Sequence, residues 1–426
     1  MVDKIAIVGG VRTPFAKAFT GLAGLSAFDL ALTVTQELLQ RSELPPDAVD
    51  EMIFGSVLPT MDRLNIGREV ALAIGLDRVP GYTLGQQCAS GIQSVTSAAE
   101  HIRSGQARAV VAGGSESMSN TALTYRRRLV RALRGLQKAR GTGSKLKALG
   151  KVRLADFLPR PPAIEEPSTG LSMGQHCELM AQINGISREA QDAYALDSHR
   201  KAAAAGDAGR ISGDLVPVPL PPDYGSFFTA DNLIRAGTTL EQLAGLRPVF
   251  DRRLGSLTAG NSSALTDGAS AVMVMSQSRA QELGLEIWGF IRGYDYVAIA
   301  PHPQLLLGPA YAVPRVLDRA GLTLADIDLL EIHEAFAAQV LSVTQKLEAD
   351  SFARDELGRS QAVGRIDWDT LNVNGGSLAF GHPFAATGGR ILINLLQELR
   401  RRDKELGLLT ICTANAMGVA MILERN

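Results

Sequence analysis

The sequence from Gln87 to Gly114 reads QCASGIQSVTSAAEHIRSGQARAVVAGG and contains the unit from which the fold can be inferred. Apolar residues recur every three or four positions between Ala89 and Ile102, which predicts a helix. The apolar run Ala109–Ala112 then predicts a buried strand, which a Gly-Gly pair closes. A helix that leads into a buried strand is typical of a parallel or mixed sheet covered by helices.

The second half of the chain repeats this layout. His382 precedes a predicted helix at Thr387–Arg401, and a predicted strand at Leu408–Cys412 follows it. Cys88 holds the corresponding place before the first helix. The repeat predicts an internal duplication, in which each half sets a reactive side chain at a loop that opens a helix.

The remaining signals support an α/β fold. Ser26, with Asp29 three residues later, predicts a capped helix start. Between Asn120 and Gly245 helix signals occur with few strand signals, which indicates an insertion. We expect an N-terminal half at 1–119 and 246–285, an inserted loop domain at 120–245 and a C-terminal half at 286–426. Further strands are predicted at Lys4–Val8, Met52–Ser56, Ala271–Met275, Trp288–Tyr296, Leu329–Ile332 and Val419–Leu423, and a further helix at Pro309–Ala320.

Composition narrows the classes of function. The chain has 426 residues and a formal net charge of −1, which argues against a globally basic nucleic-acid binder. Its three cysteines are widely spaced and lack zinc-site spacing, so we expect a reducing compartment and no metal. No glycine fingerprint for a redox cofactor occurs. No secretory signal or membrane-spanning run is recognisable, and we expect a cytoplasmic protein.

Four residues are candidates for chemistry. Cys88 lies at a predicted helix start, where the helix dipole is expected to lower the pKa of the thiol. His382, between a glycine and a proline, could act as its base. His333 and Cys412 each end an apolar strand, where α/β proteins commonly place their sites. Taken singly, each could instead be a structural or surface residue.

Together these motifs closely resemble the thiolase family. The resemblance implies two duplicated βαβαβαββ halves in a five-layered αβαβα arrangement, with the insertion added, and a homodimer. The motifs run in family order and are Gln87–Gly91, Gly113–Ser119, Thr258–Ser263 with Asp267–Ala269, and Gly381–Pro383 with Ala386–Gly388.

The resemblance also implies roles for the candidate residues. Cys88 is the nucleophile, His382 its base, and Cys412 the acid that protonates the enolate product. His333 and His382 form one oxyanion hole, and the backbone N–H groups of Cys88 and Ala414 form the other. No cofactor is implied, because coenzyme A is a substrate.

The coenzyme A contacts carry over from the same resemblance. Ser263 and Ala259 match positions along the pantetheine channel, and Arg235 matches an arginine near the nucleotide. One departure concerns Asn415 and Ala416, which stand where the family usually has glycines. If those positions require a positive φ, asparagine tolerates it better than alanine, and the loop that carries Ala414 is expected to be reshaped.

The subfamily follows from His333, where most thiolases have asparagine. The sequence HEAF at His333–Phe336 and the long insertion are similar to the β subunit of fatty-acid β-oxidation trifunctional complexes. The resemblance therefore implies a 3-ketoacyl-CoA thiolase. The open alternatives are an acetyl-CoA acetyltransferase that runs the condensation to acetoacetyl-CoA, and a weakly catalytic acyl-CoA-binding subunit.

The insertion contains a strongly basic segment at 126–153. It has eleven Lys or Arg and no Asp or Glu, interleaved with leucines. This pattern is typical of a basic amphipathic helical segment. It could be a solvated face, a docking site for an α-type hydratase/dehydrogenase subunit, or a peripheral contact with an anionic membrane.

Overall fold

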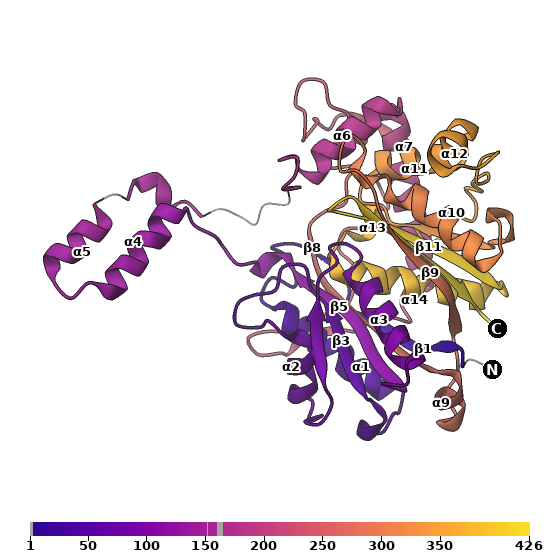
Figure 1. The fold of residues 1–426 in the computed structure, drawn as a ribbon, viewed down its shortest axis with the longest axis horizontal. Helices are drawn as coiled ribbons and strands as arrows, with labels where there is room; N and C mark the ends of the chain where they lie inside the picture. Colours follow the sequence, from indigo (N-terminus) through magenta and orange to yellow (C-terminus); the bar gives the residue numbers. More distant parts are fainter. Residues whose placement is uncertain (1–2, 151, 160–164) are drawn as a thin grey trace.

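A computed structural model describes residues 3–150, 152–159 and 165–426 (Figure 1). The first half forms one part of a mixed sheet in the strand order β4-β3-β5-β8-β1. β3 pairs in parallel with β4 and β5, whereas β8 pairs antiparallel with β5 and β1. The elements of this half are β1 (Ile5–Arg12), β2 (Ala16–Lys17), α1 (Ala27–Arg41), β3 (Glu51–Gly55), α2 (Ile66–Ala73), β4 (Gly81–Leu84), α3 (Ser90–Arg103), β5 (Ala109–Ser117), β8 (Thr266–Ser276) and α9 (Gln277–Glu282).

The second half repeats the arrangement in the strand order β10-β11-β12-β9. β10 and β11 pair in parallel, and β12 pairs antiparallel with β11 and β9. Two residue pairs between β1 and β9 join the two parts of the sheet. The elements are β9 (Gly289–Ala298), α10 (Gly308–Ala320), β10 (Leu329–Ile332), α11 (Ala337–Leu347), α12 (Asp350–Leu357), α13 (Ser377–Phe380), α14 (Ala385–Arg402), β11 (Leu406–Thr413) and β12 (Met417–Glu424).

The predicted βαβαβαββ order is therefore present, with one local difference. In the second half, the third strand is reduced to a single parallel bridge between Leu330 and Leu371. Asn372 has φ 45°, which ends the extended conformation there. Its side-chain Oδ1 accepts a hydrogen bond from the Ile332 N–H at 2.8 Å. This side-chain bond takes the place of the next backbone hydrogen bond between the two segments.

Three hydrophobic clusters lie between the predicted five layers. Figure 1 shows the arrangement of the helices and strands that form these layers. The central cluster packs α3 and α14 between the strands of the two halves. A second cluster places α1 and α2 on the outer face of the first half, and a third places α10 and α11 on the outer face of the second. The predicted thiolase-like αβαβα arrangement is confirmed.

Glycines allow α3 and α14 to approach closely. A Cβ atom at Gly91 would lie 2.3 Å from the Ala385 carbonyl oxygen, and one at Gly114 would lie 2.0 Å from the same atom. The prediction that glycines close the strand after Ala112 is wrong, because β5 continues to Ser117. Gly114 is a strand residue whose missing side chain makes room for the first residue of α14.

The predicted cap of α1 is confirmed. The Asp29 N–H donates to Ser26 Oγ at 3.2 Å, and the Ser26 N–H donates to Asp29 Oδ2 at 2.8 Å. This reciprocal pair satisfies two backbone donors that a helix start leaves free.

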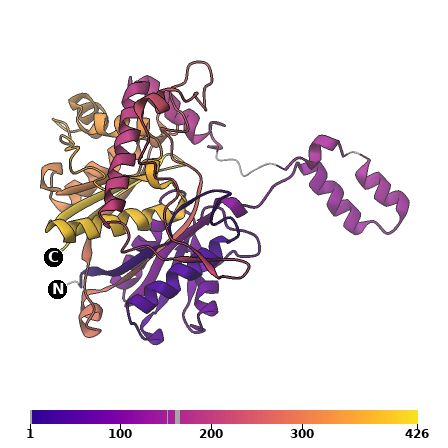
Figure 2. The ribbon, with the colours of Figure 1, turned by 180° about the vertical axis from the view of Figure 1, so that it is seen from behind.

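The stretch predicted as an insertion contributes in two ways. Its later part packs on the body, where Val216 and Val218 join the outer core of the first half. Its basic part forms a helical hairpin of α4 and α5 that stands away from the body in both views (Figures 1 and 2). Lys151, a member of the predicted basic segment, lies outside the described residues. The elements are α4 (Arg127–Lys138), α5 (Thr142–Leu149), α6 (Met173–Ile183), α7 (Arg188–Asp207), β6 (Val218–Leu220), β7 (Ser226–Phe228) and α8 (Leu240–Ala244).

A buried ion-pair network fastens this stretch to β1. The Arg12 guanidinium donates to Asp214 Oδ2 at 2.9 Å and to the two carboxylate oxygens of Asp231 at 2.8 and 3.0 Å. All three side chains are at most 5% exposed. Because the network positions Asp231, it also positions the segment that leads to Arg235.

Within the part of the chain that the structure describes, no helix combines the length and apolarity needed to cross a bilayer.

Candidate active site

Cys88 lies in a tight turn immediately before α3. Gln87 adopts φ 50°, and the Ser90 hydroxyl donates to the Gln87 carbonyl at 2.6 Å while it accepts from the Gln86 N–H at 2.8 Å. These bonds fix the turn and hold the half-buried thiol over the helix start.

His382 lies on the corresponding loop before α14. Its N–H donates to the Ala264 carbonyl at 3.1 Å and to Thr266 Oγ1 at 3.0 Å. Gly381 has φ 86°, and a Cβ atom there would lie 2.3 Å from Thr266 Oγ1, so only glycine allows this turn. Nδ1 of the His382 ring lies 2.6 Å from Thr387 Oγ1, which orients the ring.

His333 follows the last residue of β10. Its backbone N–H donates to the Thr410 carbonyl at 2.9 Å, and its Nδ1 lies 3.1 Å from Ser377 Oγ. The next residue, Glu334, is buried and accepts hydrogen bonds from Ser198 Oγ at 2.7 Å and from Asn372 Nδ2 at 2.8 Å. Glu334 therefore anchors the loop on which His333 lies.

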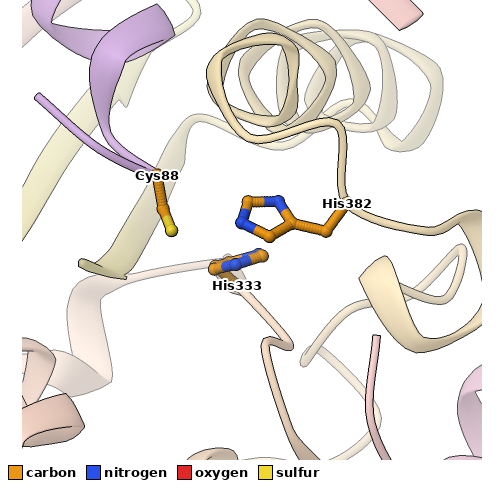
Figure 3. A group of neighbouring side chains, drawn as sticks. All are labelled: Cys88, His333 and His382. Carbon is orange, nitrogen blue, oxygen red and sulfur yellow. The ribbon is translucent and has the colours of Figure 1, made fainter. Parts of the chain in front are cut away.

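The three side chains meet (Figure 3). One ligand atom each of Cys88, His333 and His382 lie within 4.8 Å of one another. The two imidazole rings are 4.2 Å apart between centroids and inclined by 47°. The Nε2 atoms of both rings are buried and have no hydrogen-bond partner among the described residues. Buried polar atoms of this kind are rare and identify a place where a reacting group would bind.

Cys412 lies at the end of β11, opposite Gly418 of β12, and is 1% exposed. Burial, with a further contribution from the nearby Cys88, raises the pKa of Cys412 well above its ordinary value. The third cysteine, Cys177, is fully buried, and Cys412 also contributes to raising its pKa after burial. All three thiols therefore lie in the same region of the molecule.

The expectation of a lowered pKa for Cys88 is wrong. Burial raises the pKa of Cys88 to about 12, even though hydrogen bonds from the backbone N–H groups of Ala414 and Cys88 itself act in the opposite direction. Burial removes the thiolate from water. This destabilises the charged form more than the two N–H groups and the helix start stabilise it. Cys88 is thus a neutral thiol.

Both histidines are neutral as well. Burial and the charge of Arg390 lower the pKa of His382 to about 3. Burial, His382 and Arg390 lower the pKa of His333 well below its ordinary value. A neutral imidazole beside a neutral thiol can take the thiol proton as the sulfur attacks, so charge develops only during the reaction.

A cavity of about 680 Å³ is large enough for an elongated ligand. Its lining includes Ala264, whose carbonyl accepts from the His382 N–H. Arg235, Ala259 and Ser263, which were predicted to contact coenzyme A, all line it. Lys17 and His199 line it too. Ala414, predicted with the same group, lies instead at the thiol, where its N–H contacts Cys88.

The thiolase N-terminal domain family matches residues 5–278, and the thiolase C-terminal domain family matches residues 285–425. The chain belongs to the thiolase family. It is an acyltransferase, and the predicted family and enzyme class are confirmed.

This thiolase is 47% identical over 423 residues to the 3-ketoacyl-CoA thiolases of Escherichia fergusonii and of Yersinia enterocolitica, which covers 99% of the chain and 97% of each relative. The Bacillus anthracis acetyl-CoA acetyltransferase is similar in structure, with a TM-score of 0.87 and 34% identity over 100% of this chain and 99% of that chain. The human mitochondrial 3-ketoacyl-CoA thiolase is also similar, with a TM-score of 0.84 and 30% identity over the same shares.

Two residues of the loop after Cys412 have a positive φ. Asn415 has φ 64° and Ala416 has φ 55°, a backbone conformation that favours glycine. The Gln87 side chain donates from Nε2 to Asn415 Oδ1 at 2.9 Å, which joins this loop to the turn that holds Cys88. The reshaping expected from the replaced glycines stays a prediction.

Two substitutions at Asn415 distinguish the cost of a positive φ from the loss of the hydrogen bond to Gln87. Asn415→Ala is expected to lower the free energy of unfolding by about 1–2 kcal/mol, because alanine tolerates the left-handed region poorly. Asn415→Gly keeps that region accessible and loses only an exposed hydrogen bond, which is worth about 0.5 kcal/mol. Chemical denaturation of both variants measures the two costs, and equal destabilisation would contradict a positive φ at Asn415.

Several residues of the site were missed at the sequence level. Thr387 and Ser377 orient the two rings. Arg390 is a buried charged group close to both rings, and Glu116 is one close to Cys88. Thr387 lies inside a quoted motif, five residues after His382, a spacing at which a helix start can fold back on the preceding loop. Ser377 and Arg390 carry no local signal, because only the fold brings them to His333.

The trio also has the donor atoms of a metal site. Cys88, His333 and His382 are the only such group among the described residues.

Proposed function

We propose that this thiolase is a 3-ketoacyl-CoA thiolase of fatty-acid β-oxidation, which uses coenzyme A as a substrate and no cofactor. It would cleave a 3-ketoacyl-CoA to acetyl-CoA and an acyl-CoA shortened by two carbons. The observation that carries the proposal is the meeting of the Cys88 thiol with two buried imidazoles whose Nε2 atoms have no protein partner.

The first half-reaction follows from the geometry. His382 Nε2 takes the Cys88 proton as the sulfur attacks the 3-keto carbon. The bond between carbons 2 and 3 breaks, and its electrons pass to the acetyl-CoA enolate, which takes a proton from Cys412. The 3-oxygen would lie in the hole formed by the N–H groups of Cys88 and Ala414, and the enolate oxygen in the hole formed by His333 and His382.

The second half-reaction returns the enzyme to its resting state. A new coenzyme A thiol gives its proton to the Cys412 thiolate and attacks the acyl-Cys88 thioester. The S–C bond to Cys88 breaks, and the sulfur of Cys88 takes back from His382 Nε2 the proton that it gave up in the first step. The first step breaks a carbon–carbon bond and forms a thioester on Cys88, and the second exchanges that thioester for another. Each step can run in reverse, so the same residues could carry out the condensation, and the metabolite pools set the direction.

Thiolysis of short- and long-chain 3-ketoacyl-CoA substrates tests this proposal. We expect turnover with chains longer than acetoacetyl-CoA. Turnover of acetoacetyl-CoA alone would indicate an acetyl-CoA acetyltransferase. Binding of coenzyme A without turnover would indicate the weakly catalytic subunit, an alternative that the contact of the Ala414 N–H with the Cys88 thiol disfavours.

We also propose that the enzyme is a cytoplasmic homodimer. β4 ends the strand order of the sheet, so its outer edge could pair with a second copy. Sedimentation equilibrium of the purified chain measures this directly, and a monomer would contradict the proposal.

The α4–α5 hairpin is proposed as a docking site for an α-type hydratase/dehydrogenase subunit. Leu133, Leu146 and Leu149 are 40–67% exposed on it. Among the described acidic residues, Asp156 pairs with Arg126 and Arg128 at 3.9 Å, and the rest of the hairpin's charge faces outward without an ion pair. Exposed apolar residues within a basic surface suit a partner with an acidic rim or an anionic membrane.

Reversing Arg127, Arg131 and Arg134 to glutamate is expected to abolish copurification with the partner subunit while thiolysis is retained. The matched control reverses Arg252 and Arg253, which are exposed on the body. If the variant instead loses binding to anionic vesicles and keeps the partner, the hairpin is a membrane contact. If neither changes, the hairpin is a solvated surface.

A further inference from the structure

Ser377 is fully buried between an arginine and an active-site histidine. Arg390 Nη2 donates to Ser377 Oγ at 2.9 Å, and the same oxygen lies 3.1 Å from His333 Nδ1. Among the described residues, Ser377 Oγ has no other hydrogen-bond partner. The three groups form a chain that begins at α14, passes through the first residue of α13 and ends at the ring that faces Cys88.

The donors and acceptors of this chain fix the position of one proton. A guanidinium can only donate, so Ser377 Oγ accepts from Arg390. The single hydroxyl proton then needs an acceptor, because an unsatisfied buried hydroxyl is costly. The acceptor within reach is His333 Nδ1. If Nδ1 carried a proton instead, the hydroxyl hydrogen of Ser377 would have no acceptor among the described groups.

We propose that Arg390 and Ser377 are positioning residues that hold His333 in the tautomer with the proton on Nε2. His333 then presents an N–H donor to the reacting oxygen, whereas His382 must present a lone pair at Nε2 to act as base. For that, Nδ1 of His382 carries its proton and donates to Thr387 Oγ1 at 2.6 Å. The two neighbouring imidazoles thus take opposite roles, and the donor that sets them apart is Arg390, which contacts only the hydroxyl behind His333.

The effect of this tautomer on catalysis rests on the proposed function, whereas the hydrogen-bond chain from Arg390 to His333 does not. The charge of Arg390 contributes to lowering the pKa of both rings, after burial, and so keeps them neutral and able to exist as distinct tautomers. The guanidinium itself is fixed over the Phe380 ring, 5.3 Å from its centroid.

The tautomer can be measured without reference to activity. Nitrogen NMR of the enzyme labelled with ¹⁵N-histidine distinguishes a protonated ring nitrogen from an unprotonated one, and the chain has six histidines, so comparison with His333→Asn assigns the signals. We expect His333 to carry its proton on Nε2 in the wild type and to populate both tautomers in Ser377→Ala. A proton on Nδ1 of His333 in the wild type overturns the proposal even if the enzyme is an active thiolase.

Steady-state kinetics distinguish a Ser377 that positions His333 from a Ser377 that only stabilises the fold. Ser377→Ala is expected to lower kcat by about 10-fold. This is less than the 10²–10³-fold lost when an oxyanion donor is removed outright, because His333 still populates the tautomer with the proton on Nε2. Asparagine presents an amide donor that has no tautomer. In the His333→Asn background the same Ser377→Ala change is therefore expected to alter kcat by less than about 2-fold.

If Ser377→Ala lowers kcat equally in the wild type and in the His333→Asn background, and thermal unfolding is unchanged, Ser377 does not act through His333. Ser377 is the better site for this test, because replacing Arg390 would leave the buried Glu331, whose charge interacts with it, without compensation and endanger folding. Complete inactivity of the wild type would refute the proposed function, whereas the NMR result would still decide the tautomer.

Discussion

Cys88→Ala is expected to lower kcat for thiolysis by about 10⁴-fold or more while leaving coenzyme A binding intact. The sulfur of Cys88 is the described nucleophile beside both unpartnered Nε2 atoms, and alanine removes it without adding bulk. The cavity proposed to bind coenzyme A is lined by Arg235, Ala259 and Ser263, and Cys88 is not among its lining residues. Steady-state thiolysis and calorimetric titration with coenzyme A measure the two effects.

Cys177→Ala is the matched control. Cys177 is buried at the apolar core near Cys412 and is not part of the trio. Its loss is expected to change kcat by no more than a few-fold. Equal loss of activity in the two variants would show that the effect of Cys88→Ala reflects general damage.

His382→Asn is expected to lower kcat by about 10²–10⁴-fold, the usual contribution of a positioned base. The reason lies in the two pKa values. The pKa of Cys88 is raised to about 12 and that of His382 is lowered to about 3, so the neutral pair predominates throughout the range between them. The wild-type rate of acyl transfer is therefore expected to be nearly independent of pH between 5 and 9 as far as these two groups control it.

The variant is expected to differ in its pH dependence. Without the base, attack requires a thiolate already formed, and the thiolate fraction rises with pH below the pKa of the thiol. The residual rate of His382→Asn should therefore increase about 10-fold per pH unit. His101→Asn, on the surface of α3, is the control and should keep the wild-type profile. A flat profile in His382→Asn would contradict the role of His382 as base.

Much of the fold could be predicted from the sequence, because its signals are local. Ser26 and Asp29 are three residues apart, and the apolar strand at Leu329–Ile332 has the predicted bounds. Gly114 was misread for a physical reason. A glycine within a strand and a glycine after it look alike in sequence, and only the packed Ala385 carbonyl shows which one is present.

The site was predictable as a set of residues and not as an electrostatic environment. Cys88, His333 and His382 were expected together, and the structure brings them together. The sequence predicts the pKa of Cys88 in the wrong direction, because the helix start favours the thiolate and burial disfavours it more strongly. Desolvation depends on every neighbour of the thiol, and most of them lie on other parts of the chain.

The residues behind the histidines were not predictable. Ser377 lies 44 positions after His333, and nothing in its own sequence neighbourhood distinguishes it from any other serine. Asn415 illustrates a milder case. Its positive φ could be anticipated from the glycines usual in the family, whereas its hydrogen bond to Gln87 joins residues 328 positions apart.

The central claim is that the acyl group is carried on Cys88, and its most direct test is to trap that intermediate. The enzyme would be incubated with an acyl-CoA, quenched in acid, digested and analysed by mass spectrometry, with and without a chase of free coenzyme A. The account predicts acylation of the peptide that contains Cys88, removed by the chase and absent in Cys88→Ala. Acylation at Cys412 or Cys177, or turnover with Cys88 unmodified throughout, would contradict it.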